Sequence, residues 1–255
     1  MANASSRLRV KPTSKPPPYG VDGHALHNEI LLGLPGEECD SVFSKLQLVQ
    51  MRTHDVMHET GGPITHGYFV NTGLASILSL MADGKSVEVG LVGKEGFAGL
   101  PLVVGLRTSP NRVVTQVEGT AFKVSAAHLA EVLRRCPQLE RRLNRYSQDL
   151  AMQATQVAAC NRLHEVHERL ARWLLMSQDR IGTAVVPLTQ EFLAHMLGTR
   201  RASVTVAAGI LQKAGLINYT RGEVKIISRR NLEDAACECY AVMTRQSRLW
   251  QKESQ

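Results

Sequence analysis

Two adjacent arginines, Arg200 and Arg201, stand in the stretch LTQEFLAHMLGTRRASVTVAAGILQKAGL, which spans residues 188–216. A guanidinium group is always charged and suits a polyanionic partner. The period of the apolar residues places both arginines at the start of a second short helix, away from its apolar face. A plain helical hairpin in a core is the alternative interpretation, and two charges that open its second helix count against it.

The stretch as a whole predicts a helix-turn-helix. Thr189 is a good N-cap for the first helix, and Gly198 can adopt the left-handed conformation that ends it. Ala194, Gly198 and Val204 have the spacing that the motif needs for close helix contact, a turn and a core wedge. Apolar residues recur at helical spacing in both halves, namely Phe192, Leu193, Met196 and Leu197, then Val204, Ala207 or Ala208, and Leu211.

Composition narrows the setting of this motif. The chain has 255 residues, 44% of them hydrophobic, which is enough for one large domain or two ordinary ones. Its net charge of +7 favours a polyanion, either nucleic acid or an acidic membrane face. The sequence has no run of eighteen apolar residues, so we predict no transmembrane helix. The N-terminus lacks a signal-peptide core, so we expect a cytoplasmic protein. The five scattered cysteines make no disulfide framework.

The N-terminal half predicts a β-roll. Residues 1–22 are rich in Ser, Pro, Lys and Arg, which predicts a disordered basic arm. Between residues 40 and 125 apolar and polar residues alternate in short runs. Turn dipeptides at Gly61-Gly62, Asp83-Gly84 and Glu118-Gly119 separate the runs. This pattern is typical of about eight antiparallel strands in a compact barrel or roll.

Helical periods return in the C-terminal half. A heptad-like stripe runs over residues 137–160 through Leu139, Leu143, Tyr146, Leu150, Gln153 or Ala154, and Val157. A long helix with one narrow apolar seam generally pairs with another helix, which favours a homodimer, although packing against its own barrel is the alternative. After the helix-turn-helix, INYTRGEVKII predicts a hairpin with a basic turn at Arg221-Gly222. A final amphipathic helix, LEDAACECYAVM, follows it.

This combination resembles the Crp/Fnr superfamily of bacterial transcription regulators. The resemblance covers roughly residues 28–230 and is most specific in the helix-turn-helix. It implies an α+β fold with a cyclic-nucleotide-binding-like β-roll, a long dimerisation helix and a C-terminal winged helix-turn-helix. The corresponding boundaries are 1–22 for the arm, 23–136 for the roll, 137–160 for the dimerisation helix and 161–255 for the DNA-binding domain.

The resemblance also assigns residues to DNA. Arg201 matches the guanine-reading arginine, whose fork bonds guanine O6 and N7 together. Ala202 stands where many relatives have a base-reading glutamate, and Val206 where the cyclic AMP receptor has a second arginine. The half-site should therefore differ, with a thymine methyl against Ala202 or Val206. Thr205 and Arg200 are each candidates for base or phosphate contact, and the remaining phosphate candidates are Thr189, Ser203 and Arg221.

The sensor half departs from the cyclic-nucleotide cassette. In GKEGFAGLPLVVGLRTSPNRVVTQVEG, Gly99 matches the cassette glycine, but Leu100 replaces the ribose-binding glutamate. Arg112 falls near the arginine position and is followed by two valines. Lost partners for a ribose hydroxyl and a phosphate weaken binding, so we do not expect cyclic AMP or cyclic GMP in the usual way. Gly99, Arg107, Ser109 and Arg112 are the candidates for another small anionic effector.

The sequence predicts no cofactor and no metal site. Cys237-x-Cys239 has too few partners for zinc, and on a helix the two side chains would diverge. Only Cys39 precedes residue 136, which argues against an N-terminal iron–sulfur cluster. The cluster His54, His58 and His66 leaves haem or a metal-dependent enzyme as an alternative. No nucleophile–base motif, phosphate loop or carboxylate pair is present, so we predict that the chain is not an enzyme.

The sequence thus predicts a homodimeric regulator that reads a near-palindromic site in double-stranded DNA under control of an unidentified signal at the roll. RNA polymerase is a further candidate partner, and a membrane is not expected. A rival hypothesis is a metabolite- or nucleotide-binding module that acts through protein partners rather than DNA. Steep weakening of DNA binding with salt would separate the two.

Overall fold

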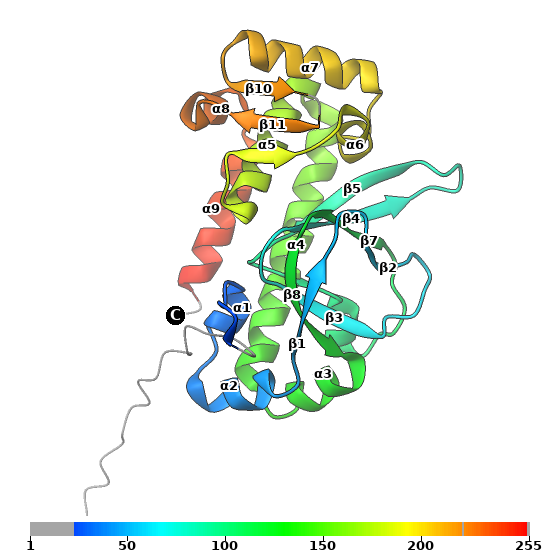
Figure 1. The fold of residues 1–255 in the computed structure, drawn as a ribbon, viewed down its shortest axis with the longest axis vertical. Helices are drawn as coiled ribbons and strands as arrows, with labels where there is room; N and C mark the ends of the chain where they lie inside the picture. Colours follow the sequence, from blue (N-terminus) through cyan, green and yellow to red (C-terminus); the bar gives the residue numbers. More distant parts are fainter. Residues whose placement is uncertain (1–22, 221, 254–255) are drawn as a thin grey trace, which may run out of the picture.

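The computed structural model describes residues 23–220 and 222–253, and it divides them into a β-roll, a long helix and a C-terminal helical domain (Figure 1). The predictions for the arm at residues 1–22 and for Arg221 lie outside the described residues. None of the described helices is long and apolar enough to cross a membrane.

Eight strands form the roll, as the alternating pattern predicts. They pair in two four-stranded antiparallel sheets with the orders β1-β8-β3-β6 and β2-β7-β4-β5. Phe69, Phe97 and Phe122 are fully buried between the sheets, and the rings of Phe69 and Phe97 lie 4.5 Å apart. The strands are β1 (Gln47–Met51), β2 (Val56–His58), β3 (His66–Val70), β4 (Leu74–Leu80), β5 (Ser86–Val92), β6 (Phe97–Ala98), β7 (Arg112–Val117) and β8 (Gly119–Ser125).

Short helices close the ends of the roll. Asn28 caps α1 (Glu29–Leu32) by accepting a hydrogen bond from the Leu31 amide at 3.1 Å, and its own amide group bonds to the roll. Helix α2 (Gly36–Phe43) follows before β1. Ser125 caps α3 (Ala126–Leu133) in the same way after β8, and a 3-10 turn over Leu100–Val104 connects β6 to β7.

The long helix α4 (Pro137–Leu163) runs from the foot of the roll to the C-terminal domain (Figure 1). Its predicted apolar stripe is largely used inside the same chain, because Leu139, Leu143, Tyr146 and Gln153 are buried against neighbouring elements. The apolar stripe in the sequence is compatible both with this packing and with dimerisation. A dimer therefore needs a different face of α4.

The C-terminal domain packs around α5 (Val166–Ile181), whose residues 169–177 are all buried. A capping box between Glu165 and Glu168 starts this helix, and Gly182 ends it. The domain continues with β9 (Val185–Pro187), α6 (Gln190–Met196), α7 (Arg201–Lys213), β10 (Ile217–Thr220), β11 (Glu223–Ile226), α8 (Arg229–Ala235) and α9 (Cys239–Lys252).

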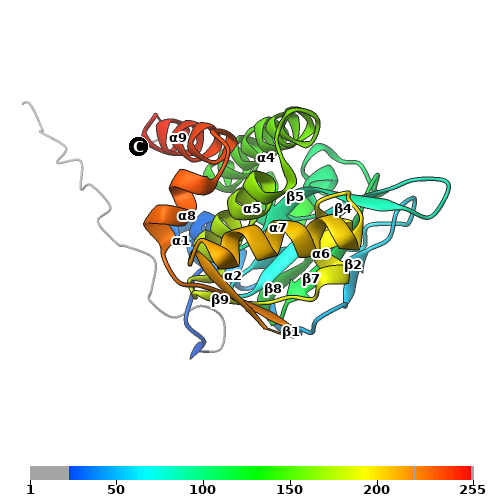
Figure 2. The same cartoon turned by 90° about the horizontal axis from the view of Figure 1, so that it is seen from above.

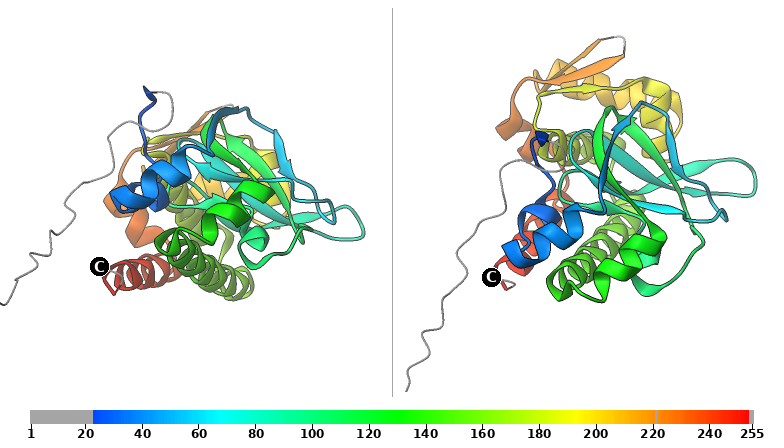
Figure 3. Two further views of the ribbon diagram at one scale, coloured as in Figure 1. Left: turned by 90° about the horizontal axis from the view of Figure 1, so that it is seen from below. Right: turned by 60° about the horizontal axis from the view of Figure 1, so that its bottom comes forward.

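The final helix differs from its prediction. The sequence predicts one helix through LEDAACECYAVM, whereas the structure breaks it into α8 and α9 at residues 236–238. Ala236 adopts an extended conformation with φ −81° and ψ 150°, which ends α8. Helix α9 then runs back beside α4, as seen from below in Figure 3. The hydroxyl of Ser247 on α9 donates a hydrogen bond of 2.6 Å to Asp149 on α4.

Candidate nucleic-acid interface

The helix-turn-helix forms where the sequence predicts it. Thr189 caps α6, because its hydroxyl oxygen accepts a hydrogen bond of 3.2 Å from the Phe192 amide. Gly198 lies in the turn with φ +56°, a left-handed conformation that favours glycine. A side chain there would also approach Val87 of β5, since an added Cβ would lie 3.0 Å from it. The turn is therefore fixed both by its own geometry and by the roll.

Helix α7 has two sharply different faces. The inner face buries Val204, Ala207, Ala208 and Leu211 in the domain core. The outer face exposes all four predicted base-reading residues, Arg201, Ala202, Thr205 and Val206. Figure 2 shows α7 lying across the outer surface of the domain, away from α9. A helix placed in this way can enter a groove without disturbing its own core.

Two positive charges lie at the start of α7, and no ion pair among the described residues accounts for them. Arg200 is the N-cap residue and Arg201 opens the helix, where the dipole disfavours positive charge. Both side chains are exposed, and neither forms an ion pair with any carboxylate whose position is described. The amide groups of the same turn and the two guanidinium groups together make a local site for an anion.

The other predicted phosphate contacts lie around this turn. Thr189 is exposed at the start of α6, and Ser203 is half-buried on the first turn of α7. The Thr205 hydroxyl is already engaged, at 3.0 Å from Gln190 Oε1 and 3.1 Å from the Arg201 carbonyl. Its oxygen can still accept a bond from outside.

The predicted wing is present as a three-stranded sheet of order β10-β11-β9. The side chain of Gln212 on α7 accepts a hydrogen bond of 2.8 Å from the Tyr219 amide and so ties β10 to the helix. Lys225 and Thr220 are exposed on the hairpin. The wing and α7 therefore form one surface.

The roll holds a second candidate site, a cavity of about 280 Å³ between the roll and α4. Gly99 and Ser109 line it, as predicted for an effector site, together with His58, Leu150 and Ala154. Arg107 and Arg112 do not line it: Arg107 is exposed, and Arg112 pairs with Glu59 at 3.4 Å. The cluster of ligand candidates proposed from the sequence is therefore split.

The three histidines do not form a metal site. His54 lies in a turn with φ +72°, whereas His58 lies in β2 and His66 in β3. The imidazole of His58 is buried and lies 2.8 Å from the His66 carbonyl, and burial lowers its pKa. The positions of these histidines therefore do not support a metal-dependent enzyme.

Buried polar groups connect the roll to the C-terminal domain. Trp173 on α5 donates a hydrogen bond of 2.7 Å to Glu88 on β5, and Ser76 donates another to the same carboxyl group. Burial raises the pKa of Glu88 to about 7, although these hydrogen bonds oppose the shift. Nearby, Arg180 on α5 pairs with Glu95 at 2.8 Å. The roll and α5 are therefore in direct polar contact.

Sequence reasoning missed one group of residues with metal-ligand chemistry. Cys160, His164, Cys237 and Cys239 bring their ligand atoms within 4.8 Å of one another. We expected no zinc site, because Cys237 and Cys239 had too few partners and would diverge on one helix. In the structure, Cys160 and His164 at the end of α4 are two further partners, and Cys237 lies before α9 rather than on it. The spacing Cys160-x3-His164 was the available signal, since residues four apart share a helix face.

Comparison with known proteins supports both domains. Residues 168–235 match the Crp-like helix-turn-helix domain, and residues 48–136 match the cyclic nucleotide-binding domain. No curated protein sequence matches the chain at a significant level.

Solved structures share the fold at low sequence identity. FixK2 from Bradyrhizobium japonicum is 16% identical, with a TM-score of 0.65 over 75% of this chain and 98% of that one. The global regulator CLP from Xanthomonas campestris is 17% identical, with a TM-score of 0.63 over 75% and 99%. A transcriptional regulator of the Crp/Fnr family from Eubacterium rectale is 15% identical, with a TM-score of 0.62 over 82% and 98%.

Two of these solved structures are described as a global regulator and a transcriptional regulator. A cyclic nucleotide-binding fold followed by a Crp-like helix-turn-helix is the domain order predicted from the sequence. The chain belongs to the Crp/Fnr family of DNA-binding transcription regulators.

Proposed function

We propose that the protein is a homodimeric, sequence-specific regulator that reads a near-palindromic DNA site through α7 of each protomer. The observation that carries the proposal is the outer face of α7, which combines two arginines that pair with no described carboxylate and exposed apolar side chains. Val206 is 64% exposed and Ile210 is 46% exposed, on a helix whose other face is fully packed. Such a mixed face suits the major groove, which offers both hydrogen-bond acceptors and thymine methyl groups.

Each predicted contact residue has a definite role in this proposal. Arg201 bonds O6 and N7 of a guanine, and the small side chains of Ala202 and Val206 contact a thymine methyl. Arg200, Thr189, Ser203 and Arg221 contact phosphates, which set the register of the helix without specifying sequence. Exposed wing residues such as Lys225 add to the phosphate contacts.

Dimerisation would use the outward face of α4. Ala151, Thr155 and Ala158 recur there with spacings of four and three residues, and all three are exposed. Small side chains in a heptad-like row permit a second helix to approach closely. The buried stripe meanwhile holds α4 on its own roll. The two recognition helices of such a dimer would lie about 34–36 Å apart to reach successive turns of one DNA face.

The cavity between the roll and α4 is the proposed effector site. No lysine or arginine is among the described residues that line it, and most of the lining is apolar. A bound phosphate would lose its charged partners there, so a largely apolar effector fits better than a cyclic nucleotide. CLP responds to cyclic di-GMP, which makes this dinucleotide a useful comparison ligand. Effector binding would act on α5 through the contacts of Glu88 and Glu95.

Fluorescence anisotropy with labelled DNA tests the proposal. We expect affinity to fall steeply as salt rises, because phosphate contacts release counterions, and we expect a specific duplex to bind about a thousandfold or more tightly than a random one. Sedimentation of the same protein should give a dimer. Equal, weak affinity for every duplex, with salt-insensitive capture of a protein partner, would instead support the rival docking module. Contact with RNA polymerase stays a prediction, to be tested by transcription from a promoter that carries the selected site.

A further inference from the structure

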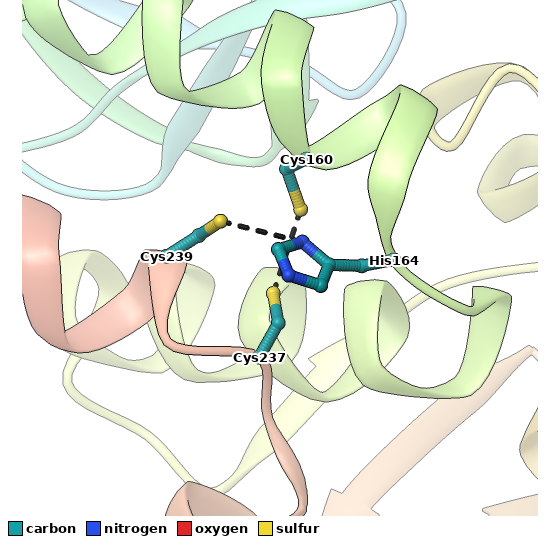
Figure 4. Close-up of side chains that lie close together, drawn as sticks. All are labelled: Cys160, His164, Cys237 and Cys239. Carbon is teal, nitrogen blue, oxygen red and sulfur yellow. Dashed lines mark hydrogen bonds between the residues drawn. The ribbon is translucent and has the colours of Figure 1, made fainter.

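Four side chains with metal-ligand chemistry converge where α9 meets the end of α4. Three cysteine sulfurs and one imidazole nitrogen point toward one another from the two segments, as Figure 4 shows. The residues are Cys160, His164, Cys237 and Cys239, and their ligand atoms all lie within 4.8 Å of one another. The three cysteines are buried and His164 is half-buried.

The local backbone explains the convergence. Cys160 lies on the last turn of α4, and His164 ends that helix with φ −110° and ψ 151°, so that its ring turns back toward Cys160. Cys237 lies in the break between α8 and α9, whereas Cys239 is the first residue of α9. The break thus lets two cysteines two residues apart face the same point, which they could not do within one helix.

The distances fit one tetrahedral ion. Cys160 Sγ lies 3.4 Å from Cys237 Sγ, and Cys239 Sγ lies 3.5 Å from His164 Nδ1. A zinc ion with ordinary bond lengths would hold two sulfurs about 3.8 Å apart and a sulfur and a nitrogen about 3.6 Å apart. An iron–sulfur cluster contains several metal atoms and needs ligands spread more widely. Thiolate ligands also disfavour magnesium and calcium, which prefer oxygen.

Outer groups already orient two of the four ligands. Glu238 Oε2 lies 3.0 Å from His164 Nε2, so this carboxylate can accept a hydrogen bond from Nε2–H and leave the Nδ1 lone pair facing the sulfurs. This carboxylate–histidine arrangement is the usual support of a metal-bound imidazole. The Gln156 amide donates a hydrogen bond of 3.1 Å to Cys239 Sγ. Such a bond stabilises a thiolate.

Two buried arginines supply matching charge. Arg172 is 3% exposed and Arg169 is 7% exposed, and each has an Nε without a hydrogen-bond partner. No described carboxylate lies within 4.0 Å of either guanidinium group. Both arginines interact electrostatically with Cys160 and Cys237. One Zn²⁺ ion with three thiolates and a neutral imidazole carries a net charge of −1, which would offset half of the buried charge of the two arginines.

We propose that Cys160, His164, Cys237 and Cys239 bind one Zn²⁺ ion. Because the protein supplies all four ligands, the site is closed and structural rather than catalytic. The ion would fasten the start of α9 to the junction between α4 and α5, the point where the long helix passes into the DNA-binding domain. This inference does not depend on the proposed effector or operator.

Metal analysis of the full-length protein tests the proposal. We expect about one zinc per chain after gel filtration under reducing conditions. Protein stripped of metal and reloaded with Co²⁺ should show the intense bands of a tetrahedral site with thiolate ligands, and Zn²⁺ should displace them. Zinc-free protein that binds neither ion would overturn the proposal. So would iron with acid-labile sulfide, or a Cys160–Cys237 disulfide found after thiols are trapped at lysis.

Variants locate the site. Cys160→Ser and Cys237→Ser should each weaken zinc binding more than a hundredfold, whereas Glu238→Gln, which only positions His164, should weaken it about tenfold at unchanged stoichiometry. Cys39→Ser and Cys136→Ser are matched controls, since these cysteines are equally buried but lie outside the group, and they should retain full zinc. Equal zinc loss in the controls would overturn the assignment.

Thiol alkylation of the wild-type chain decides the question even where a variant does not fold. A chelator should increase alkylation selectively at Cys160, Cys237 and Cys239, and added Zn²⁺ should reverse the increase. Cys39 and Cys136 should react equally with and without the chelator. Alkylation that a chelator leaves unchanged at all five cysteines would contradict a metal at this site.

Discussion

The outer face of α7 and the junction of α4, α5 and α9 carry polar chemistry in opposite ways. On α7, Arg200 and Arg201 point into solvent with no partner among the described carboxylates. At the junction, the three cysteines and Arg172 are buried with their polar atoms turned inward. An exposed surface of this kind suits a large partner that covers it, whereas an inward-facing group of ligands suits a single small ion.

The difference predicts separable effects of substitution. Changes at Arg201, Ala202 and Val206 should alter DNA binding and leave the free energy of unfolding nearly unchanged, because those side chains are exposed. Changes at the junction should alter stability first, because they leave buried polar groups without partners. A substitution on the α7 face that mainly lowers stability, or one at the junction that mainly weakens DNA binding, would contradict this difference.

Removal of zinc from the junction should have the largest effect. If free Zn²⁺ exceeds the dissociation constant a thousandfold, binding stabilises the fold by about 4 kcal/mol. Thermal unfolding followed by circular dichroism should therefore show a lower midpoint when a chelator is present. Cys237→Ser should start from the lower midpoint and show no response to the chelator. An unfolding midpoint that a chelator leaves unchanged in the wild-type chain would contradict zinc binding at the junction.

Glu88 offers the next largest effect, through pH. Its pKa is about 7 in the folded chain and 4.5 as an isolated side chain, so the unfolded chain loses this proton first as pH rises. Stability should therefore fall as pH rises from about 4.5 to about 7, by up to about 3 kcal/mol.

Glu88→Gln removes that ionisation and keeps an acceptor for Trp173. We expect the variant to be more stable than the wild type at pH 8, with the difference fading toward pH 4.5 in urea titrations. The exposed carboxylate of Glu118 provides the control, and Glu118→Gln should show no such dependence. A constant difference across the pH range would mean that the burial of Glu88 is not what destabilises the chain.

Arg201→Ala tests the exposed side of the comparison. We expect it to cost about 2 kcal/mol of specific DNA binding and to relax the preference for one guanine, while the unfolding midpoint stays constant. Lys213→Ala removes the same charge from the far end of α7 and should change binding much less. Anisotropy with matched and single-mismatch duplexes measures both. Equal losses in the two variants would reduce Arg201 to a general charge contact.

Val206→Ala should have the smallest effect. The side chain is exposed, so its loss leaves no cavity, and only the contact with a thymine methyl would disappear. We expect a loss of about 1 kcal/mol or less, confined to one base pair. Binding to duplexes with uracil in place of that thymine provides the control, since the variant and the wild type should then bind equally.

Local periodicity was enough to predict the fold. The helix-turn-helix depends on residues within one stretch, such as Thr189, Gly198 and Val204, and the roll depends on alternation within each strand. The same reasoning placed the exposed face of α7 correctly. It could not decide the partner of the α4 stripe, because an apolar seam has the same pattern whether it packs on its own roll or on a second chain.

Local sequence patterns could not predict the metal-ligand group, because its members lie far apart in the chain. Cys160 and Cys237 are 77 residues apart, and only the return of α9 along α4 brings them together. That return depends on the helix break at residues 236–238, where the amphipathic pattern predicts a continuous helix. The placement of Arg112 in the effector site was missed for the same reason, because its side chain pairs with Glu59 on another segment.

Selection of bound sequences from a random DNA pool tests whether the outer face of α7 reads DNA. The account predicts that the wild-type protein enriches an inverted repeat whose half-sites are centred about 10 base pairs, or a multiple of this, apart. It also predicts that Arg201→Ala loses one guanine preference within each half-site. No enriched motif from the wild-type protein, or the same motif from both proteins, would contradict the reading of DNA by the outer face of α7.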